Sequence, residues 1–224
     1  MADNKLCIAI LGGTGELGTG LARRWTQAGY DVIIGSRTQE KAQEALIQLQ
    51  AIMVERGANA DHVQAMDNVA AAQAADIVAL TVPFAHQTST LETVKDALSG
   101  KILIDVTVPL VPPKVARVQL PEGGSAGQIA QDFLGESVHV VSAFQNVAAY
   151  HLQEGQGLEC DVLVTGDNLA ARGKVIELIE AIGMRGLHAG PICNSAAAEA
   201  LTSLLIVMNK RYKTHAGIRI TGIE

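Results

Sequence analysis

Apolar runs alternate with amphipathic stretches along this chain. Short runs rich in Ile, Val, Leu and Ala are typical of strands that are buried on both faces of a sheet. They predict strands at residues 6–11, 31–34, 62–66, 77–82, 101–106, 137–142, 160–165 and 185–188. Helical spacing of apolar positions predicts helices at residues 16–28, 38–56, 69–75, 88–98, 128–134, 168–182 and 195–210. This alternation indicates an α/β fold, in which a doubly wound parallel sheet lies between two layers of helices.

The same pattern suggests one main domain and a small C-terminal extension. We expect residues 1–145 to form the main domain, and residues 146–224 to continue the sheet, complete a substrate pocket and end in a helix. Apolar residues recur at helical spacing between residues 201 and 208. The last helix therefore either packs on its own domain or forms the interface of a homodimer.

A glycine cluster stands between the first strand and the first helix. Gly13, Gly15 and Gly18 have the G-x-G-x-x-G spacing of a dinucleotide-binding turn. In such a turn one glycine permits the bend, the next lets backbone approach a pyrophosphate, and the third lets the helix pack on the strand. The helix N-terminus then attracts the phosphates. The position after an apolar run favours a Rossmann-type nucleotide site over a glycine-rich turn without a ligand.

The end of the second strand indicates which dinucleotide binds. An NAD-binding unit has Asp or Glu about twenty residues after the glycines, bound to the ribose hydroxyls. This chain has Gly35, Ser36 and Arg37 there, and Lys41 follows in the next helix. These polar groups bind a 2′-phosphate, which a carboxylate would repel. We therefore predict NADP, although Ser36 as a helix cap beside solvated cations is the alternative.

Composition and charge narrow the function classes. A hydrophobic content of 48% supports a large core, whereas 3% aromatic residues and a net charge of −6 do not favour nucleic acid or an anionic membrane as partners. The three cysteines lack metal-ligand and disulfide spacing. No signal-peptide pattern precedes the first strand, and the late apolar segment at residues 196–208 is too short for a bilayer. We expect a cytoplasmic protein without a metal site.

Few acids or bases stand at the ends of the predicted strands, where the ligand of an open α/β sheet binds. His86 and His151 are the histidines nearest the expected site. No tyrosine has the lysine four positions later that a short-chain dehydrogenase needs, and the chain after Gly190 is too short for the helical domain of an imine reductase or β-hydroxyacid dehydrogenase. What remains is hydride transfer by positioning, as between two stacked heterocycles.

A set of motifs now carries a family resemblance. The motifs are Leu11-Gly12-Gly13-Thr14-Gly15-x-Leu17-Gly18, Gly35-Ser36-Arg37 with Lys41, Leu80-Thr81-Val82-Pro83-Phe84-x-His86, Val108-Pro109-Leu110-Val111-Pro112, Val141-Ser142-Ala143, Ala189-Gly190-Pro191 with Asn194-Ser195, and Glu199-Ala200-Leu201-Thr202. In this order, over nearly the whole chain, the sequence resembles the NADPH-dependent coenzyme F420 reductases, also called F420H2:NADP oxidoreductases.

The resemblance implies a site and a reaction. It implies that NADP(H) is bound by Gly13, Thr14, Gly15, Glu16, Leu17, Ser36, Arg37, Lys41, Thr81, Pro83, Phe84 and Ala149, with the nicotinamide near Phe84 and Ala149. The deazaflavin F420 would stack on the nicotinamide against Pro109, Leu110, Gln145 and Asn146. A hydride would pass between the two rings, and members of the family usually form homodimers through their C-terminal helices.

One departure from the family pattern keeps alternatives open. The family commonly has a histidine where this chain has Gln145, and often a proline where it has Ala148. A glutamine still hydrogen-bonds a ring carbonyl but carries no charge, so Gln145 and His86 are only candidate catalytic residues. The alternatives are an NADPH-dependent reductase of a flavin, quinone or metal chelate, and an NADP(H)-sensing protein without turnover.

Overall fold

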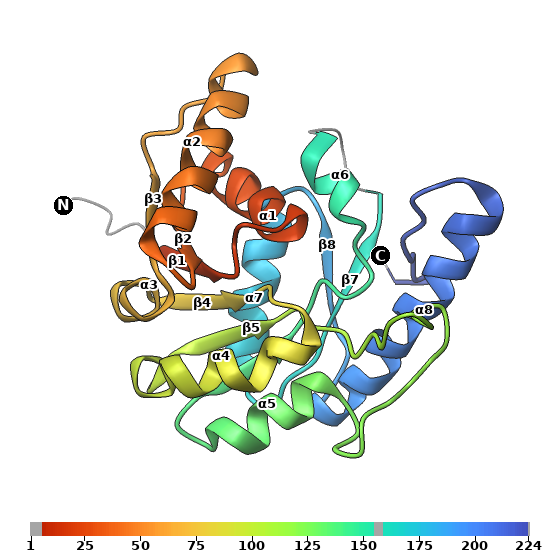
Figure 1. The fold of residues 1–224 in the computed structure, drawn as a ribbon. Helices are drawn as coiled ribbons and strands as arrows, with labels where there is room; N and C mark the ends of the chain where they lie inside the picture. The colour runs from red at the N-terminus through yellow and green to blue at the C-terminus, as the bar shows by residue number, and fades with distance from the viewer. Residues whose placement is uncertain (1–5, 155–158, 224) are drawn as a thin grey trace.

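Six parallel strands form the main sheet, in the order β3-β2-β1-β4-β5-β6 (Figure 1). The structure is a computed structural model that describes residues 6–154 and 159–223. The strands are β1 (Cys7–Leu11), β2 (Asp31–Ser36), β3 (Val63–Asp67), β4 (Ile77–Leu80), β5 (Ile102–Asp105) and β6 (His139–Ser142). This order reverses direction between β1 and β4, and an open α/β sheet binds ligands at such a point. The predicted doubly wound α/β fold is confirmed.

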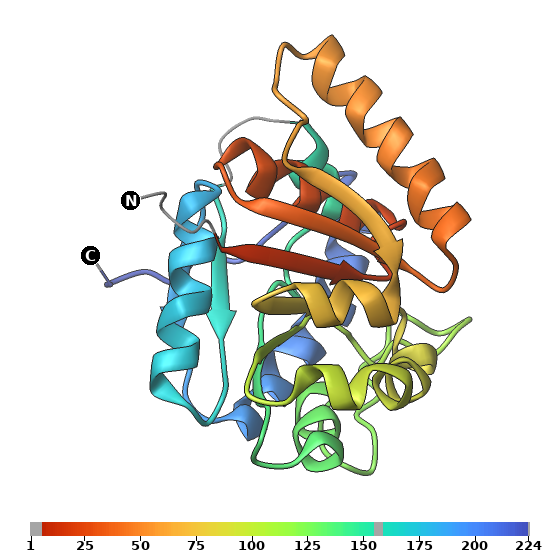
Figure 2. The same cartoon turned by 90° about the vertical axis from the view of Figure 1, so that its left-hand side faces the viewer.

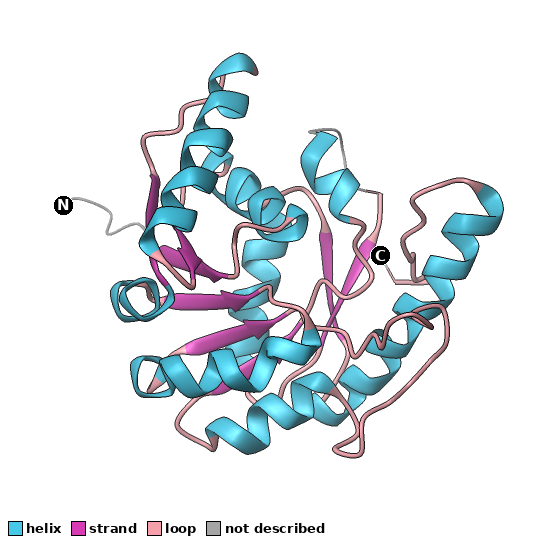
Figure 3. Cartoon of the chain, in the orientation of Figure 1, coloured by secondary structure: helices cyan, strands magenta, loops and turns pink. Residues whose placement is uncertain are grey.

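Two layers of helices cover the sheet (Figures 2 and 3). They are α1 (Glu16–Gln27), α2 (Gln39–Glu55), α3 (Asn68–Ala74), α4 (Gln87–Val94) and α5 (Ala126–Leu134), with short 3₁₀ turns at Phe84–His86 and Lys95–Leu98. Successive side chains of a strand point to opposite faces. Ile8 and Ile10 therefore join the core with α1 and α2, while Ala9 and Leu11 join the core with α3, α4 and α5.

The C-terminal extension differs from the prediction in its sheet. It contains β7 (Asp161–Val164), α7 (Leu169–Ala181), β8 (Arg185–His188), a 3₁₀ turn at Ile192–Asn194 and α8 (Ser195–Tyr212). The two strands pair with each other in a separate parallel sheet, so the expectation that the extension continues the main sheet was wrong. It meets β6 at one antiparallel bridge between Ser142 and Thr165. The ladder stops there because the chain leaves the sheet at Phe144, which has a positive φ of 72°.

Helix α6 (Ala149–Glu154) was not predicted. Its six residues are too few for a helical period to stand out in the sequence. Its position depends on α1, because Arg24 donates from Nε to the carbonyl of Leu152 at 3.1 Å and Arg23 donates to the same carbonyl. The contact is close at Gly20, where a Cβ would lie 2.7 Å from the Cβ of Leu152. Tertiary contacts therefore hold this short helix against α1.

The segment Ile192–Tyr212, which contains α8, is longer than the predicted helix. By length and composition it is the one candidate membrane span within residues 6–154 and 159–223, although core helices of soluble proteins pass the same test. Its first turns are tied to the protein by polar contacts, since Glu199 accepts from the N–H groups of Ala126 and Gly127. Ser203 also donates to the carbonyl of Val115 at 3.0 Å.

Candidate nucleotide-binding site

The glycine turn is built by close backbone contacts. Gly13 donates its N–H to the carbonyls of Ile10 and Gly35, at 3.2 and 3.0 Å. A Cβ on Gly13 would lie 2.7 Å from the carbonyl oxygen of Ile10, and a Cβ on Gly18 would lie 2.7 Å from the Cα of Gly13. Gly12 has a positive φ of 71°. These glycines let α1 begin directly above the end of β1.

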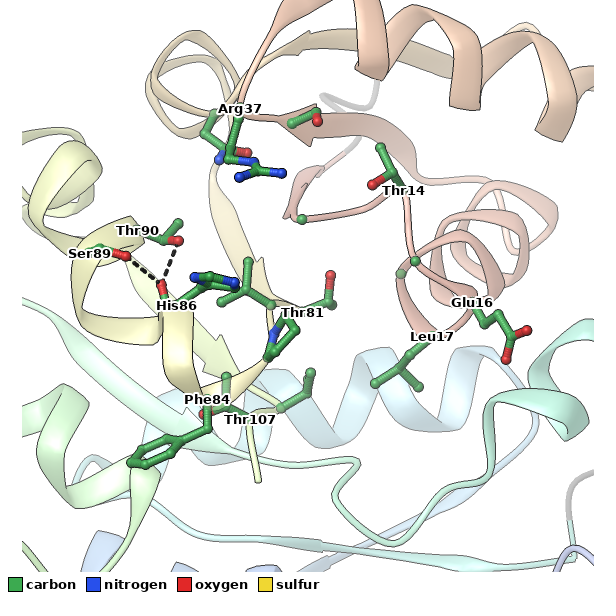
Figure 4. Close-up of a pocket in the computed structure, with 18 of the residues that line it drawn as sticks. Thr14, Glu16, Leu17, Arg37, Thr81, Phe84, His86, Ser89, Thr90 and Thr107 are labelled. Carbon is green, nitrogen blue, oxygen red and sulfur yellow. Dashed lines mark hydrogen bonds between the residues drawn. The ribbon is translucent and has the colours of Figure 1, made fainter. Parts of the chain in front are cut away.

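A cavity of about 770 Å³ lies at the carboxyl ends of β1, β2, β4 and β5. It is lined by Gly12, Thr14, Gly15, Glu16, Leu17, Gly18, Ser36, Arg37, Lys41, Asn68, Thr81, Val82, Pro83, Phe84, His86, Ser89, Thr90, Val106, Thr107, Val108 and Leu110. The cavity extends from Arg37 at one end to Phe84 and Thr107 at the other (Figure 4). Its volume and shape suit an extended ligand that crosses the point where the strand order reverses.

The N-terminus of α1 points its amide groups toward the middle of this cavity. Gly15 is the N-cap residue, and no side chain in the described part of the chain caps it. Uncapped N–H groups and the positive end of the helix dipole form an anion site. Glu16 stands in the first turn, but its carboxylate points away from the cavity in Figure 4. The anion site therefore remains open to a pyrophosphate.

Cationic side chains stand at the end of the cavity beyond β2. Arg37 points its guanidinium into the cavity (Figure 4), and Lys41 lines it from the first turn of α2. Neither forms an ion pair within residues 6–154 and 159–223. The cap of α2 is Thr38, whose hydroxyl accepts from the N–H of Lys41 at 3.4 Å. Ser36 is thus not used as the helix cap and lines the cavity with the two cations.

The opposite end of the cavity is mostly apolar but has a polar floor. Leu17, Phe84 and Leu110 line it, and Thr81 donates its hydroxyl proton to the carbonyl of Leu11 at 2.9 Å. Below it, Asp105 is fully buried. Burial raises the pKa of Asp105 from its ordinary value, against the lowering effect of hydrogen bonds from Thr107 and Gln87. This end therefore offers an apolar slot for a ring, bounded by fixed polar groups.

Some of the predicted site residues lie outside the cavity. Among the described residues that line it, Gly13, Pro109, Gln145, Asn146 and Ala149 are absent. Gln145 is 6% exposed and donates from Nε2 to the carbonyl of Asp105 at 2.9 Å and to Ser142 Oγ at 2.8 Å. Asn146 is also buried and donates to the carbonyl of Ala198 at 2.8 Å. In this structure both amides connect elements of the protein beside the cavity.

The structure adds cavity residues that the sequence did not single out. Asn68 follows β3, and Ser89 and Thr90 lie in α4. Ser89 and Thr90 both donate to the carbonyl of His86, at 3.2 and 2.7 Å (Figure 4). Asn68 follows the edge strand beside β2, so only the strand order places it near Arg37. No group of metal-ligating residues is present within residues 6–154 and 159–223.

Comparison with known proteins identifies the family. The model of the family "NADP oxidoreductase coenzyme F420-dependent" matches residues 7–109. The F420-dependent NADP reductase of Methanocaldococcus jannaschii is 41% identical over 97% of this chain and 99% of its own length. The chain belongs to this family. The F420-dependent NADP reductase of Methanothermobacter thermautotrophicus is 39% identical over 96% of this chain and 95% of its own length.

Solved structures support the fold of this family member. A structure from Arthrobacter sp. FB24, provisionally named an F420-dependent NADP reductase, superposes with a TM-score of 0.79 at 24% identity, over 96% of this chain and 98% of that one. An imine reductase of Bacillus cereus superposes with a TM-score of 0.63 at 18% identity, but the match covers only 63% of that longer chain. At these identities the likeness establishes the Rossmann-type fold alone.

Proposed function

We propose that this protein is an oxidoreductase that transfers a hydride between NADP(H) and the deazaflavin coenzyme F420. The observation that carries the proposal is identity near 40% over almost the full length of reductases with this name. The cavity supports it independently, because it joins an open helix N-terminus to a cationic end with no ion pair in the described residues.

NADP(H) would lie across the cavity in an extended conformation. The pyrophosphate would accept hydrogen bonds from the backbone N–H groups of Thr14, Gly15 and Glu16. The 2′-phosphate would bind to Ser36, Arg37 and Lys41. The nicotinamide would then lie toward Thr81, Pro83 and Phe84. The phosphate end would supply binding energy that is independent of the reacting ring, and this energy holds the ring in a reactive position.

F420 would stack on the exposed face of the nicotinamide, in a pocket walled by Pro109, Leu110, Gln145 and Asn146. The reaction is a hydride transfer between ring carbons, so the protein contributes orientation and exclusion of water rather than a proton-transfer group. Gln145 and Asn146 follow β6 and are held by hydrogen bonds to Asp105 and Ala198, and Ala149 begins α6. In this proposal Gln145 and Asn146 would face F420, and Ala149 would lie near the nicotinamide.

The decisive experiment mixes the purified protein with NADPH and oxidised F420 and follows the absorbance of both. We expect NADPH and oxidised F420 to be consumed in equal molar amounts, as measured by the loss of both absorbance bands, and NADH to be a much poorer donor. A flavin mononucleotide control distinguishes the alternative acceptors. Reduction of flavin, quinone or a metal chelate without turnover of F420 would contradict the assignment of F420 as the hydride acceptor. NADPH binding without any turnover would instead support the NADP(H)-sensing alternative.

We further propose that the protein is a cytoplasmic homodimer and does not use a membrane or nucleic acid. Its net charge of −6 opposes binding to polyanions. The outer face of α8 exposes Leu204, Val207 and Met208 by 44–49%. In a symmetric dimer the same surface of both subunits meets about a two-fold axis, so the apolar face of α8 in one copy would cover the same face in the other.

A further inference from the structure

Thr107 lies where the floor of the cavity meets a buried polar network. It follows β5, lines the cavity and is 3% exposed. Its hydroxyl oxygen lies 2.6 Å from Asp105 Oδ1 and 3.0 Å from Gln87 Nε2. Asp105 and Gln87 are both fully buried. Groups without access to water therefore hold this hydroxyl at the edge of the cavity.

The network determines the direction of the hydroxyl proton. Asp105 Oδ1 also accepts from the N–H of Thr107 at 2.9 Å, so this oxygen is an acceptor for both groups of Thr107. Gln87 Nε2 lies 2.6 Å from Asp105 Oδ2 and 2.9 Å from the carbonyl of Ala126, and both of these oxygens accept. An NH₂ group has two hydrogens and no acceptor position, so it cannot take the hydroxyl proton of Thr107 and at most shares a hydrogen with it.

One acceptor position on Thr107 remains for a ligand. A threonine hydroxyl has one proton and two lone pairs. The proton points to Asp105 and at most one lone pair faces Gln87, so the contacts of the described residues leave at least one lone pair. The donors of Thr107 are both used by Asp105. The Thr107 side chain is thus fixed as an acceptor and favours a ligand group that donates a hydrogen bond.

The location of Thr107 indicates which group that is. Arg37 lines one end of the cavity, where the 2′-phosphate would bind, and the N-terminus of α1 lines the part where the pyrophosphate would bind. Under the proposed function the remaining end of the cavity, beyond β4 and β5, would receive the nicotinamide ring, whose carboxamide NH₂ is its only hydrogen-bond donor. We propose that Thr107 accepts a hydrogen bond from the carboxamide NH₂ of the nicotinamide and so fixes the rotation of the ring. This proposal rests on the proposed function.

The test uses analogues that differ only at the carboxamide. Calorimetric titration gives dissociation constants for NADP⁺, for its thionicotinamide analogue, which keeps the NH₂ group, and for its 3-acetylpyridine analogue, which has a methyl group there. The proteins are the wild type, Thr107→Val, which loses the hydroxyl at nearly constant shape, and Thr107→Ser, which keeps it. Neutral hydrogen bonds predict a discrimination of about three- to tenfold against the 3-acetylpyridine analogue.

We expect the wild type and Thr107→Ser to show this discrimination, and Thr107→Val to bind all three nucleotides equally. Equal binding of the three nucleotides to the wild type would overturn the proposal, even if Thr107→Val does not fold. Equal weakening of all three by Thr107→Val would also overturn it, because Thr107 would then act on shape alone. Failure of the wild type to bind any of them would instead contradict the proposed function.

Discussion

Arg37 tests the assignment of the 2′-phosphate at the scale of one side chain. Its guanidinium points into the cavity and has no ion-pair partner in the described part of the chain. We expect Arg37→Gln to weaken NADPH about 10- to 100-fold, since hydrogen bonds to charged groups contribute about 1.5–3 kcal/mol. NADH lacks the 2′-phosphate, so its binding should change by less than about threefold.

The measurement is kcat/KM and the dissociation constant for both nucleotides. Lys174→Gln is the matched control, because it removes one surface cation from α7, far along the chain from the cavity residues. If Arg37→Gln lowered the affinity and kcat/KM equally for NADPH and NADH, the guanidinium would contact a part that both nucleotides share and not the 2′-phosphate.

Some of the predicted site residues line the cavity and others do not, and the local backbone explains the difference. Ser36 ends β2, and Arg37 and Lys41 follow it. Strand ends meet at one edge of a parallel sheet, so local sequence was enough to bring these residues together. Gln145 also follows a strand end, but its amide turns to Asp105 and Ser142. The positive φ of Phe144 reverses the chain there, and no sequence pattern signals it at a non-glycine residue.

At the scale of elements, the close contact between α1 and the glycine turn predicts the effect of a methyl group. A Cβ at Gly18 would lie 2.7 Å from the Cα of Gly13, which is backbone and cannot rotate away. Gly18→Ala should therefore destabilise the protein by about 1–3 kcal/mol and weaken NADPH by displacing the N-terminus of α1. Urea denaturation and calorimetric titration measure the two effects.

A second helical glycine provides the control for this prediction. Gly173 lies in α7, and a Cβ there would meet nothing within 4 Å. Gly173→Ala should stabilise the protein by about 0.5–1 kcal/mol, because alanine restricts the unfolded chain. If Gly18→Ala behaved like Gly173→Ala, the tight packing of α1 on the turn would be refuted.

The contact between α5 and α8 predicts a pH dependence of stability. Glu199 is 1% exposed and accepts from the N–H groups of Ala126 and Gly127 at 2.7 and 3.0 Å. Burial raises the pKa of Glu199 from 4.5 to about 7, against the effect of these two hydrogen bonds. A carboxyl group with a raised pKa stabilises the fold below its unfolded pKa, and this stability is lost as the pH rises through the folded pKa.

We therefore expect the free energy of unfolding to fall by about 3 kcal/mol between about pH 4.5 and about pH 8 because of this group. Glu199→Gln does not titrate, so its stability should vary less over the same range. Urea denaturation at several pH values measures the difference, with Glu92→Gln, an exposed carboxylate of α4, as the control. Parallel pH profiles for the wild type and Glu199→Gln would contradict the prediction.

At the scale of the whole molecule, the sequence predicted the layers better than the connections between them. Alternating apolar runs and helical periods indicate burial, which depends mainly on local pattern, and they predicted the eight strands found within the described residues. Which strands pair depends on contacts between distant segments. β7 and β8 therefore looked like two more strands of one sheet, whereas they form their own sheet next to α7. The division at residue 145 stays a prediction.

The exposed face of α8 gives the prediction that concerns the assembly. Leu204, Val207 and Met208 stand three and four residues apart, so they share one face of the helix. The buried side of the helix includes Ala198, Glu199 and Leu205, and Glu199 ties it to α5. A helix that exposes one apolar stripe and buries polar contacts on its other side is suited to docking against a second protein surface rather than to being surrounded by lipid.

We therefore expect sedimentation velocity to show a dimer for the wild type and a monomer for Val207→Glu, because the variant would bury a carboxylate in the interface without a partner. Val54→Glu, at an exposed position of α2, is the matched control and should remain dimeric. A dimeric Val207→Glu would move the interface away from α8. A wild type that is monomeric in solution but sediments with lipid vesicles would instead mean that the apolar stripe contacts a bilayer, and the homodimer proposal would fail.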